Sequence, residues 1–539
     1  MSDASHPFGP FSIPEIRDFI PEKLKPFVII FFLIIIQFSG GVYTASTGEM
    51  VGSTALMQED ITMAGLASLI GMALDFVYMF RIKCAVPPKT TFFVCGFIII
   101  VANIICMYAT SVPILVITCF VAGFFRMQAT FQCNSTIQLW LTPKRDLSVF
   151  FCWVYLIVNG TINLSGLLCV YLSDFAKWQY MQWCIIGLIL VMLIMVMLLF
   201  RNHSTMPKIP FLGIDYLGML MWGAIAMNIL FICVYGEHYD WWQSEYIWAA
   251  TIASVVLLAL VCWRSSFIRH PYIFLETFKH PIIWLAPITI IAYDTLLAPE
   301  HIFEHALMEN ILKYDALNLI SLNWVGVVGT ICSVIFTWQF FAIRKWRYRT
   351  MLMIGFSCIA LYLAYFYFTI DYDIPKEMLY IPVFLRSFGY VVLSVTVLTA
   401  NTRMPFPFQF FQGITLQNLF SAALGGAIGS AIVGRLLKIV MTKNYTLISA
   451  SMDHLNLKAS NFNFSELYGI VQQHALMISM KEIYGWLLIA SLACLFVISL
   501  PRKQMSRPIN VTHPKFSTLR KQVKHYLRMD SKEGLSIAQ

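Results

Sequence analysis

The stretch QYMQWCIIGLILVMLIMVMLLF, residues 179–200, decides what kind of protein this is. It runs for 22 residues without a charged side chain, and about 20 apolar residues are enough to cross the hydrocarbon core of a bilayer. Similar stretches recur along all 539 residues. We therefore expect an all-α integral membrane protein with fourteen spans, near 25–46, 61–80, 90–109, 112–141, 147–172, 179–200, 213–235, 246–263, 281–303, 317–342, 350–370, 379–400, 414–437 and 482–500.

The composition supports this interpretation. The chain is 59% hydrophobic and 12% charged, whereas ordinary globular chains carry roughly 25% charged residues. A soluble enzyme, a secreted disulfide scaffold and a disordered hub are therefore excluded.

Basic residues predict which side of the membrane each loop faces. Lys and Arg gather in the N-terminal segment, in every second loop, such as 81–89 and 344–349, and in the tail from Pro501. The positive-inside rule places these parts, and both termini, in the cytoplasm, and we expect the membrane to be a cell inner membrane. The net charge of +9 is then mostly a topology signal, and no nucleic-acid partner is expected.

The tail has helical periodicity of its own. Phe516, Leu519, Val523 and Leu527 share one face, and basic residues cover the other. This predicts a basic amphipathic helix on the inner leaflet of the lipid bilayer, with a calmodulin-like ligand as the alternative.

A faint internal repeat divides the chain. Arg126 within the fourth span is echoed by Arg386 within the twelfth, at an offset of 260 residues, and Gly160 and Gly166 are echoed by Gly425 and Gly429 at a similar offset. Parallel halves of this kind are a transporter architecture. We expect a cytoplasmic segment 1–24, a six-helix half 25–200, two inserted helices in 201–280, a second half 281–500 with a long outer loop 438–481, and a basic tail 501–539.

The sequence resembles the fourteen-span drug:proton antiporters of the major facilitator superfamily, of the EmrB and QacA type. The similarity is carried by Asp215-Tyr-Leu-Gly218, by Pro143-Lys-Arg145, by Gly425-Gly-Ala-Ile-Gly-Ser-Ala-Ile432 and by the position of Arg126. It departs from the family between spans two and three, where the pattern Gly-x-Leu-Ala-Asp-Arg-x-Gly-Arg is replaced by the merely basic Phe80–Lys89, and at Asn163-Leu-Ser-Gly166, which stands where antiporters have a Gly-Pro pair.

The resemblance implies proton-driven export of a small amphipathic substrate by alternating access. It also implies partners, a periplasmic membrane-fusion adaptor and an outer-membrane channel. A symporter or facilitator that imports a metabolite is the alternative within transport. No cofactor is expected.

Charges inside spans mark the candidate site, because an ionisable group at the bilayer centre costs about 2.5–3.5 kcal/mol or more. Asp75, Arg126, Asp294, Glu300 and Arg386 lie in spans. We interpret Arg126 and Arg386 as charge partners, either of an anionic substrate and a working carboxylate or of a fixed ion pair between helices.

Span nine is the most polar. Helical spacing places Glu300 and Glu304 on one face, and Pro299 is expected to kink the helix. We expect Asp294, Glu300 and Glu304 to carry the coupling proton, with Asp75 in reserve; the alternative is a solvated outer mouth. The same segment contains His301 and His305, which raises an integral-membrane metalloenzyme as a rival class, but no second histidine cluster accompanies them.

Uncharged polar residues of the first half are candidates for the wall of a substrate cavity; each is also explained by an interhelical hydrogen bond. They are Gln37, Tyr43, Asn134, Asn159 and Asn163. The repeated glycines Gly160, Gly166, Gly425 and Gly429 are expected to let helices pack closely.

Overall fold

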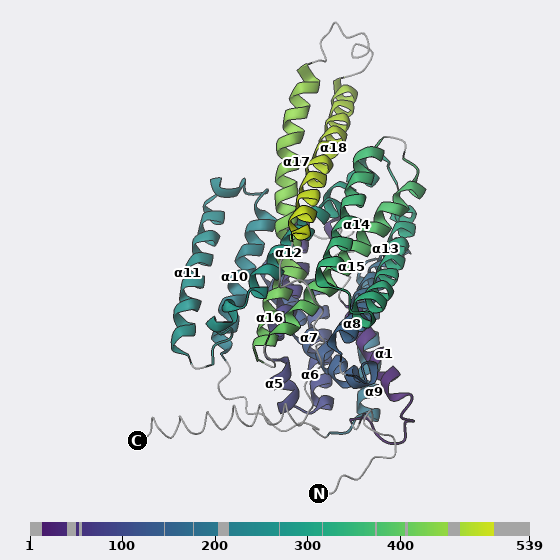
Figure 1. Cartoon of the computed structure of the whole chain (residues 1–539), viewed down its shortest axis with the longest axis vertical. Coiled ribbons are helices and arrows are strands. Elements are labelled where there is room, and N and C mark those ends of the chain that lie inside the picture. Colours follow the sequence, from purple (N-terminus) through teal and green to yellow (C-terminus); the bar gives the residue numbers. More distant parts are fainter. Residues whose placement is uncertain are drawn as a thin grey trace.

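The computed structural model describes residues 13, 15–39, 50–52, 56–144, 146–175, 177–202, 215–268, 270–304, 306–314, 316–371, 374–404, 408–450 and 464–500. Over these residues the chain is a bundle of long helices (Figure 1). An isolated β-bridge between Ile16 and Phe200 attaches the N-terminal segment to the end of the sixth span. The predicted amphipathic tail helix lies outside the described residues.

The helices follow the predicted spans in order. The first half contains α1 (Lys25–Phe38), α4 (Gln58–Asp75), α5 (Met79–Ala85), α6 (Pro88–Tyr108), α7 (Val112–Leu141), α8 (Leu147–Phe175) and α9 (Gln179–Leu199). Two helices follow, α10 (Tyr216–Tyr235) and α11 (Glu245–Phe267). The second half contains α12 (Ile282–Leu297), η4 (Glu300–Glu304), η5 (Ala306–Ile311), α13 (Ala316–Phe336), η6 (Thr337–Ile343), α14 (Tyr348–Thr369), α15 (Tyr380–Ala400), α16 (Phe408–Leu419), η9 (Phe420–Leu424), α17 (Gly425–Ala450) and α18 (Phe464–Ser499).

Short 3₁₀ turns occupy several of the connections. They are η2 (Trp241–Gln243), η3 (Leu275–Lys279), η7 (Lys376–Leu379) and η8 (Asn401–Arg403).

Twelve helical segments of the described chain are long and apolar enough to cross a membrane. The α4–α5 pair, bent by 63°, makes a thirteenth if it is counted as one broken span. The remaining predicted span contains α1, which has only 14 residues, and its expected continuation at 40–46 lies outside the described residues. The all-α membrane fold is confirmed, and the count of fourteen stays a prediction.

The two halves repeat one packing scheme. In the first half α4 packs on α7, α6 on α9 and α1 on α8; in the second α13 packs on α15, α14 on α18 and α12 on α17. The halves meet where α8 contacts α13 and where α4 contacts α16 and η9. The repeat that the sequence suggested is therefore present in three dimensions.

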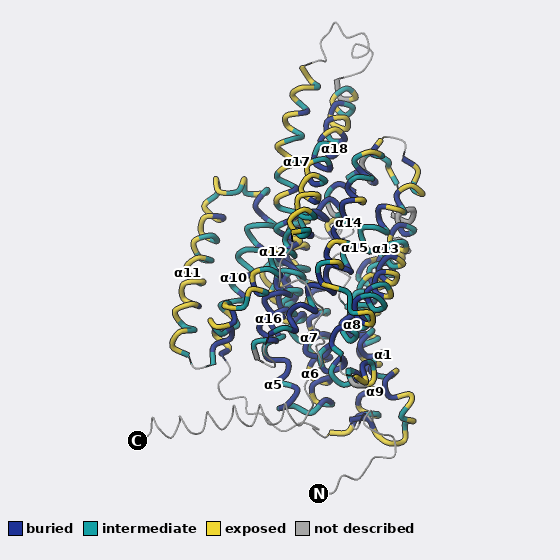
Figure 2. Tube along the Cα trace, in the orientation of Figure 1, coloured by how far each residue is buried: buried dark blue, intermediate teal, exposed yellow. Residues whose placement is uncertain are grey.

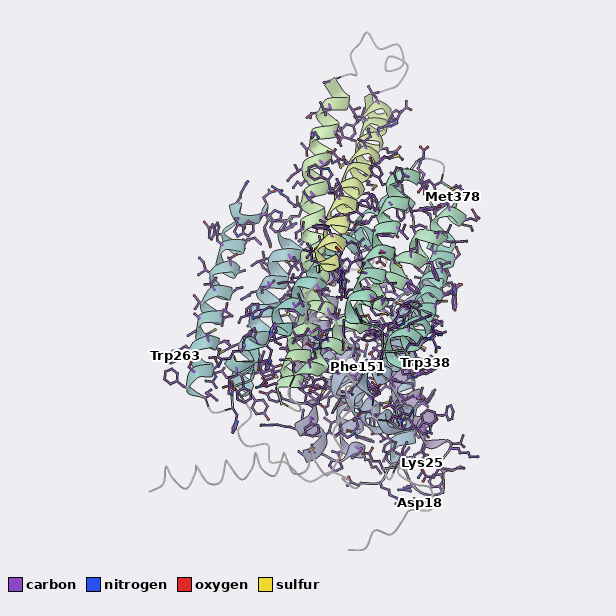
Figure 3. All side chains as sticks on the ribbon, viewed as in Figure 1. Asp18, Lys25, Phe151, Trp263, Trp338 and Met378 are labelled. Atoms are coloured by element: carbon purple, nitrogen blue, oxygen red, sulfur yellow. The ribbon has the colours of Figure 1, made fainter. Side chains whose placement is uncertain are left out.

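The two inserted helices differ in their surroundings. Helix α10 contacts α4 of the first half and α17 of the second, whereas α11 packs mainly on α10. The exposed side of α11 is apolar, and Trp263 projects from it (Figures 2 and 3). Asp215 caps the start of α10 by accepting from the Gly218 N–H, and it also accepts from Arg264 at 2.9 Å, which fastens α11 to α10.

The segment 438–481, expected as an outer loop, is largely helical. Helix α17 continues to Ala450 and α18 begins at Phe464, so both extend beyond the neighbouring helices (Figure 1). Their contact is partly polar, because Asn444 Nδ2 donates to Ser479 Oγ at 3.0 Å. Residues 451–463 lie outside the described part of the chain.

For the description below, the basic face is the end of the bundle that carries Lys83, Arg264, Lys345, Arg349 and Arg403. The opposite end is called the outer end.

Candidate functional site

Two carboxylates and one guanidinium form an ionic cluster inside the second half. Arg386 of α15 donates from Nη2 to Glu300 Oε1 at 2.9 Å and from Nη1 to Glu304 Oε2. Tyr362 of α14 donates from its hydroxyl to the other oxygen of Glu304, at 2.8 Å. The Glu304 side chain is only 6% exposed, whereas that of Glu300 is 34% exposed. Both carboxylate oxygens of the buried Glu304 are thus bound, and Glu300 is the more accessible of the two glutamates.

The local fold explains why the two glutamates converge on one arginine. Pro299 cannot donate to a helical hydrogen bond, and α12 ends at Leu297 just before it. The chain continues as a wider π-helical turn, η4, over Glu300–Glu304. Such turns are rare overall, but those that occur are often at functional sites. The change from α-helix to π-helix beside Pro299, where the sequence predicted a kink, therefore lies directly next to the cluster.

Asp294 lies near this cluster on α12 and is seated against glycines of α17. Its Oδ2 is buried and has no hydrogen-bond partner within the described part of the chain. A Cβ placed on Gly425 would stand 2.2 Å from that oxygen, and one on Gly429 would stand 2.9 Å from the Asp294 carbonyl oxygen. The two glycines therefore make room for Asp294 and allow α12 and α17 to touch.

Tyrosines connect the second half to the first beside Asp294. The hydroxyls of Tyr293 and Ser394 are 3.4 Å apart, and the rings of Tyr293 and Tyr390 meet edge to face at 5.9 Å. Tyr155 of α8, in the first half, packs against the same apolar cluster as Tyr390 and lies near Ser394 and its helix neighbour Asn159. This polar patch thus lies where a relative movement of the halves would change its contacts.

The arginine of the first half has different surroundings from its repeat. Arg126 of α7 is 4% exposed and donates to the sulfur of Met72, from Nε at 3.2 Å and also from Nη2. No ion pair of Arg126 occurs within the described residues. The repeated arginines therefore share a position but not a type of partner.

Asp75 is fully buried at the end of α4, and neither carboxylate oxygen has a hydrogen-bond partner among the described residues. Gly71, four residues earlier, lies at the α4–α7 contact, since a Cβ there would stand 2.1 Å from the Phe120 carbonyl oxygen. Gly71 and Asp75 are four residues apart and lie on one face of α4, just before the 63° bend between α4 and α5.

The other predicted residues are spread over several environments. Gln37 is buried and donates to Thr130 of α7 at 2.6 Å, an interhelical bond. Asn134 is buried, and its Oδ1 has no partner among the residues that the structure describes; Asn163 is exposed. Tyr43 lies outside the described residues. Of the predicted cavity residues that the structure describes, only Asn159 lies beside the polar patch of Tyr155, Tyr293, Tyr390 and Ser394, which is called the tyrosine patch below.

The repeated glycines also differ. A Cβ on Gly160 would meet no atom within 4 Å, in contrast to Gly425 and Gly429. Gly166 is partly buried in α8. The close helix contact made by glycine therefore occurs at α17.

Several residues of the site were missed in the sequence. Tyr390 and Ser394 follow Arg386 at steps of four on α15, and Tyr293 precedes Asp294. Extending the helical period from the known charges would have found them. Tyr155 and Tyr362 had no such signal, because their role depends on helices from elsewhere in the chain.

The metal-binding alternative depends on the histidines of span nine. No cluster of three or more His, Cys, Asp or Glu with metal-binding geometry occurs among the described residues. His305 and the side chain of His301 are outside that set.

Comparisons with known proteins place this arrangement in context. No protein-family model matches the chain. It is 19% identical over 407 residues to the probable multidrug resistance protein EmrY of Escherichia coli (strain K12), covering 72% of this chain and 77% of EmrY. The fold is similar to that of the nucleoside transporter NupG, with a TM-score of 0.53, 12% identity and coverage of 89% of this chain and 100% of NupG.

A structure of a proton-dependent oligopeptide transporter aligns with a TM-score of 0.55, 10% identity and coverage of 88% of this chain and 97% of that one. The two solved structures are of transporters rather than enzymes. The repeated six-helix packing and these similarities together show that the chain has the fold of the major facilitator superfamily, in a divergent form.

Proposed function

We propose that the chain is a secondary active transporter that exports small amphipathic compounds in exchange for protons. The observation that carries this proposal is the cluster of Arg386 with Glu300 and Glu304, close to Asp294 and next to the junction of the halves. A transporter of this kind needs a buried group whose charge changes as access alternates.

The charge balance of the cluster supports a proton site. One guanidinium faces two carboxylates, so the ionised cluster has one negative charge in excess, and Asp294 adds another nearby. Unbalanced charge is costly in a poorly hydrated interior. Uptake of one proton, by Glu300 or by Asp294, reduces this excess from two negative charges to one without breaking the bonds of the buried Glu304.

The tyrosine patch offers a means of coupling. Tyr155 belongs to the first half, and Tyr293 and Tyr390 belong to the second. A rocking motion of the halves, which is typical of repeat-built transporters, would separate Tyr155 from Tyr390 and open the polar surface next to Asp294. Aromatic walls with a few polar groups suit apolar ligands that carry a polar end.

A flux assay tests the proposal. The full chain is reconstituted into sealed vesicles, and uptake of ethidium, a fluorescent amphipathic cation, is measured with and without an imposed pH gradient. We expect gradient-driven accumulation by the wild type. Asp294→Asn and Glu300→Gln should still allow exchange down an ethidium gradient but lose accumulation driven by ΔpH, because only the protonation step is removed.

Glu237→Gln is the matched control, since Glu237 lies in the turn after α10, away from the cluster. Accumulation that remains ΔpH-driven in the double variant Asp294→Asn/Glu300→Gln would remove these residues as the coupling site. A wild type indifferent to ΔpH would refute proton coupling and favour a facilitator.

The direction of transport and the location of the protein are part of the same proposal. Export is supported by the similarity to EmrY, named as a probable multidrug resistance protein. We place the protein in an inner membrane, with the basic face on the cytoplasmic side. Reporter fusions after Lys345 and in the tail should then report cytoplasm, and a fusion near Asn461 should report the outer side; a tail on the outer side would reverse the assignment. The adaptor and outer-membrane channel remain predictions from the resemblance, and copurification tests them.

A further inference from the structure

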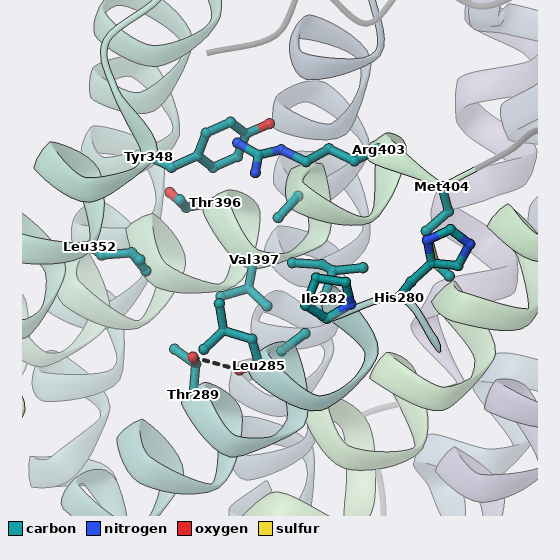
Figure 4. A pocket seen from close by; sticks show the side chains of 13 residues that line it. His280, Ile282, Leu285, Thr289, Tyr348, Leu352, Thr396, Val397, Arg403 and Met404 are labelled. Carbon is teal, nitrogen blue, oxygen red and sulfur yellow. Dashed lines mark hydrogen bonds between the residues drawn. The ribbon is translucent and has the colours of Figure 1, made fainter. Parts of the chain in front are cut away.

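A cavity of about 260 Å³ lies in the second half, at the basic face and away from the ionic cluster. It is formed by the first turns of α12 and α14 and by the last turns of α15 with η8 (Figure 4). Its lining includes Leu285, Ala286, Leu352 and Val397. An apolar cavity of about 150 Å³ is enough to hold benzene, so this one has room for a segment of an acyl chain.

The interior of the cavity presents few free polar groups. Thr289 and Thr396 line it, but their hydroxyls donate to the carbonyl oxygens of Leu285 and Val392 in their own helices, at 2.7 and 2.6 Å. These bonds leave the inner walls to methyl and methylene groups. The interior therefore suits hydrocarbon rather than a polar metabolite.

The cationic groups of the lining gather at one end of the cavity, which we call its mouth. The guanidinium of Arg403 lies over the ring of Tyr348 at 4.7 Å, and Figure 4 shows both residues at one end of the cavity. His280 also lines it, with Nε2 at 3.0 Å from Gln409 Oε1, and the exposed Lys279 precedes it in the chain. No Asp or Glu is among the described residues that line the cavity.

Helix α12 lies between the cavity and an exposed apolar surface. Trp284 and Ile288 of α12 are 59% and 62% exposed and, by helical spacing, point away from Leu285 and Ala286, which line the cavity. The cavity is therefore separated from this apolar surface by the thickness of one helix.

We infer that this cavity binds an anionic phospholipid, with part of one acyl chain inside and the headgroup phosphate at Arg403 and His280. Basic pockets at this depth are suited to anionic headgroups, and guanidinium recognises phosphate through paired N–H donors. The site is separate from the proposed proton site and does not depend on the proposed function.

Photo-crosslinking tests the assignment. The full chain in vesicles is irradiated with phosphatidylglycerol, phosphatidylcholine or free palmitate, each with a diazirine on the acyl chain, and the labelled peptides are mapped by mass spectrometry. We expect phosphatidylglycerol to label 282–289 and 396–400 about fivefold or more above phosphatidylcholine, and unlabelled phosphatidylglycerol to compete. Equal labelling by phosphatidylcholine, or labelling spread evenly over all lipid-facing helices, would overturn the inference, and so would labelling by palmitate alone.

Two variants separate charge from shape. Arg403→Gln should reduce phosphatidylglycerol labelling to the phosphatidylcholine level, whereas Arg344→Gln should not change it. Arg344 is the matched control, because it also stacks on an aromatic ring, Phe340 at 4.8 Å, but does not line the cavity. Ala400→Phe, which fills the cavity, should abolish labelling by every probe. Competition in the wild type decides the question if a variant fails to fold, and unchanged labelling in Ala400→Phe would refute the site.

Discussion

Lys345 and Asp146 form an ion pair that joins the two halves at the basic face. Lys345 lies between η6 and α14, and Asp146 precedes α8; Lys345 Nζ also donates to Ser148 Oγ at 3.1 Å. The contact spans 199 residues of sequence. In this structure the halves are therefore fastened together at the face that we assign to the cytoplasm.

Breaking this pair should favour separation of the halves at the basic face. Both side chains are partly exposed, at 28% and 20%, so the pair is worth only about 0.5–1 kcal/mol, a two- to fivefold change in populations. Asp146→Asn should therefore increase the long-distance fraction measured by electron spin resonance between labels at Lys144 and Arg347. The swap Asp146→Lys with Lys345→Asp should restore the wild-type distribution, and Lys443→Gln, which affects a pair with Glu482 elsewhere, is the control. An unchanged distribution in Asp146→Asn would contradict the role of the pair.

Loss of Arg386 should be far more harmful than loss of Arg126. Arg386→Gln leaves the buried Glu304 without its cation, at a cost of about 3–5 kcal/mol, whereas Arg126→Gln removes only bonds to a methionine sulfur. Thermal unfolding of the purified variants measures the difference. Adding Glu304→Gln to Arg386→Gln should recover part of the lost stability, because the unpaired charge is removed. Equal losses in the two single variants would show that Arg126 has an ionic partner as important as that of Arg386.

Adding a methyl group at Gly429 should weaken the α12–α17 contact. The new Cβ would meet backbone atoms of Asp294 and Thr295 at 2.9 Å, and backbone cannot move aside as a side chain can. We expect Gly429→Ala to destabilise the protein by about 1–3 kcal/mol. Gly426→Ala, three residues earlier on the same helix, has no atom within 4 Å of its Cβ and should leave the melting temperature unchanged or slightly raised. Similar melting temperatures for the two variants would show that the helices are not in close contact.

The outer end of α10 should loosen in acid. Partial burial alone would raise the pKa of Glu237, but the hydrogen bonds from Lys438 at 2.7 Å and from Trp241 Nε1 at 2.8 Å outweigh it and hold the pKa below the ordinary value of 4.5. A lowered folded-state pKa contributes stability that is present above the unfolded value and is lost as pH falls through the folded one. Hydrogen exchange of 236–244, corrected for intrinsic rates, should therefore be slow above pH 4.5 in the wild type and rise below it.

Glu237→Gln should lose this dependence and exchange faster at neutral pH. Because Glu237 is 39% exposed, the effect is modest, and an effect of equal size in a peptide from α6 would show that it is not local. A wild-type profile without a step in acid would contradict the ionic link between α10 and α17.

The sequence by itself determined the membrane class, the order of the spans and the repeat of two halves. These properties depend on local hydropathy and on periodicity along one helix, which is why residues 179–200 and the pair Glu300 and Glu304 could be interpreted without a partner. The helix break at Pro299 is similarly local, because it follows from a missing N–H.

The tertiary structure alone decided which polar groups meet. Arg386 and Arg126 occupy equivalent repeat positions, yet one binds two glutamates and the other a methionine sulfur. Tyr362 reaches Glu304 across 58 residues of sequence, and Tyr155 joins the site from the other half. Gly160 and Gly429 were both expected to let helices pack closely. Only Gly429 has the backbone of a neighbouring helix next to the position that a Cβ would occupy. Side-chain partners in a membrane bundle depend on helix rotation and crossing, which are set by contacts far apart in the chain. Hydropathy reports only that each helix is apolar enough to enter the bilayer.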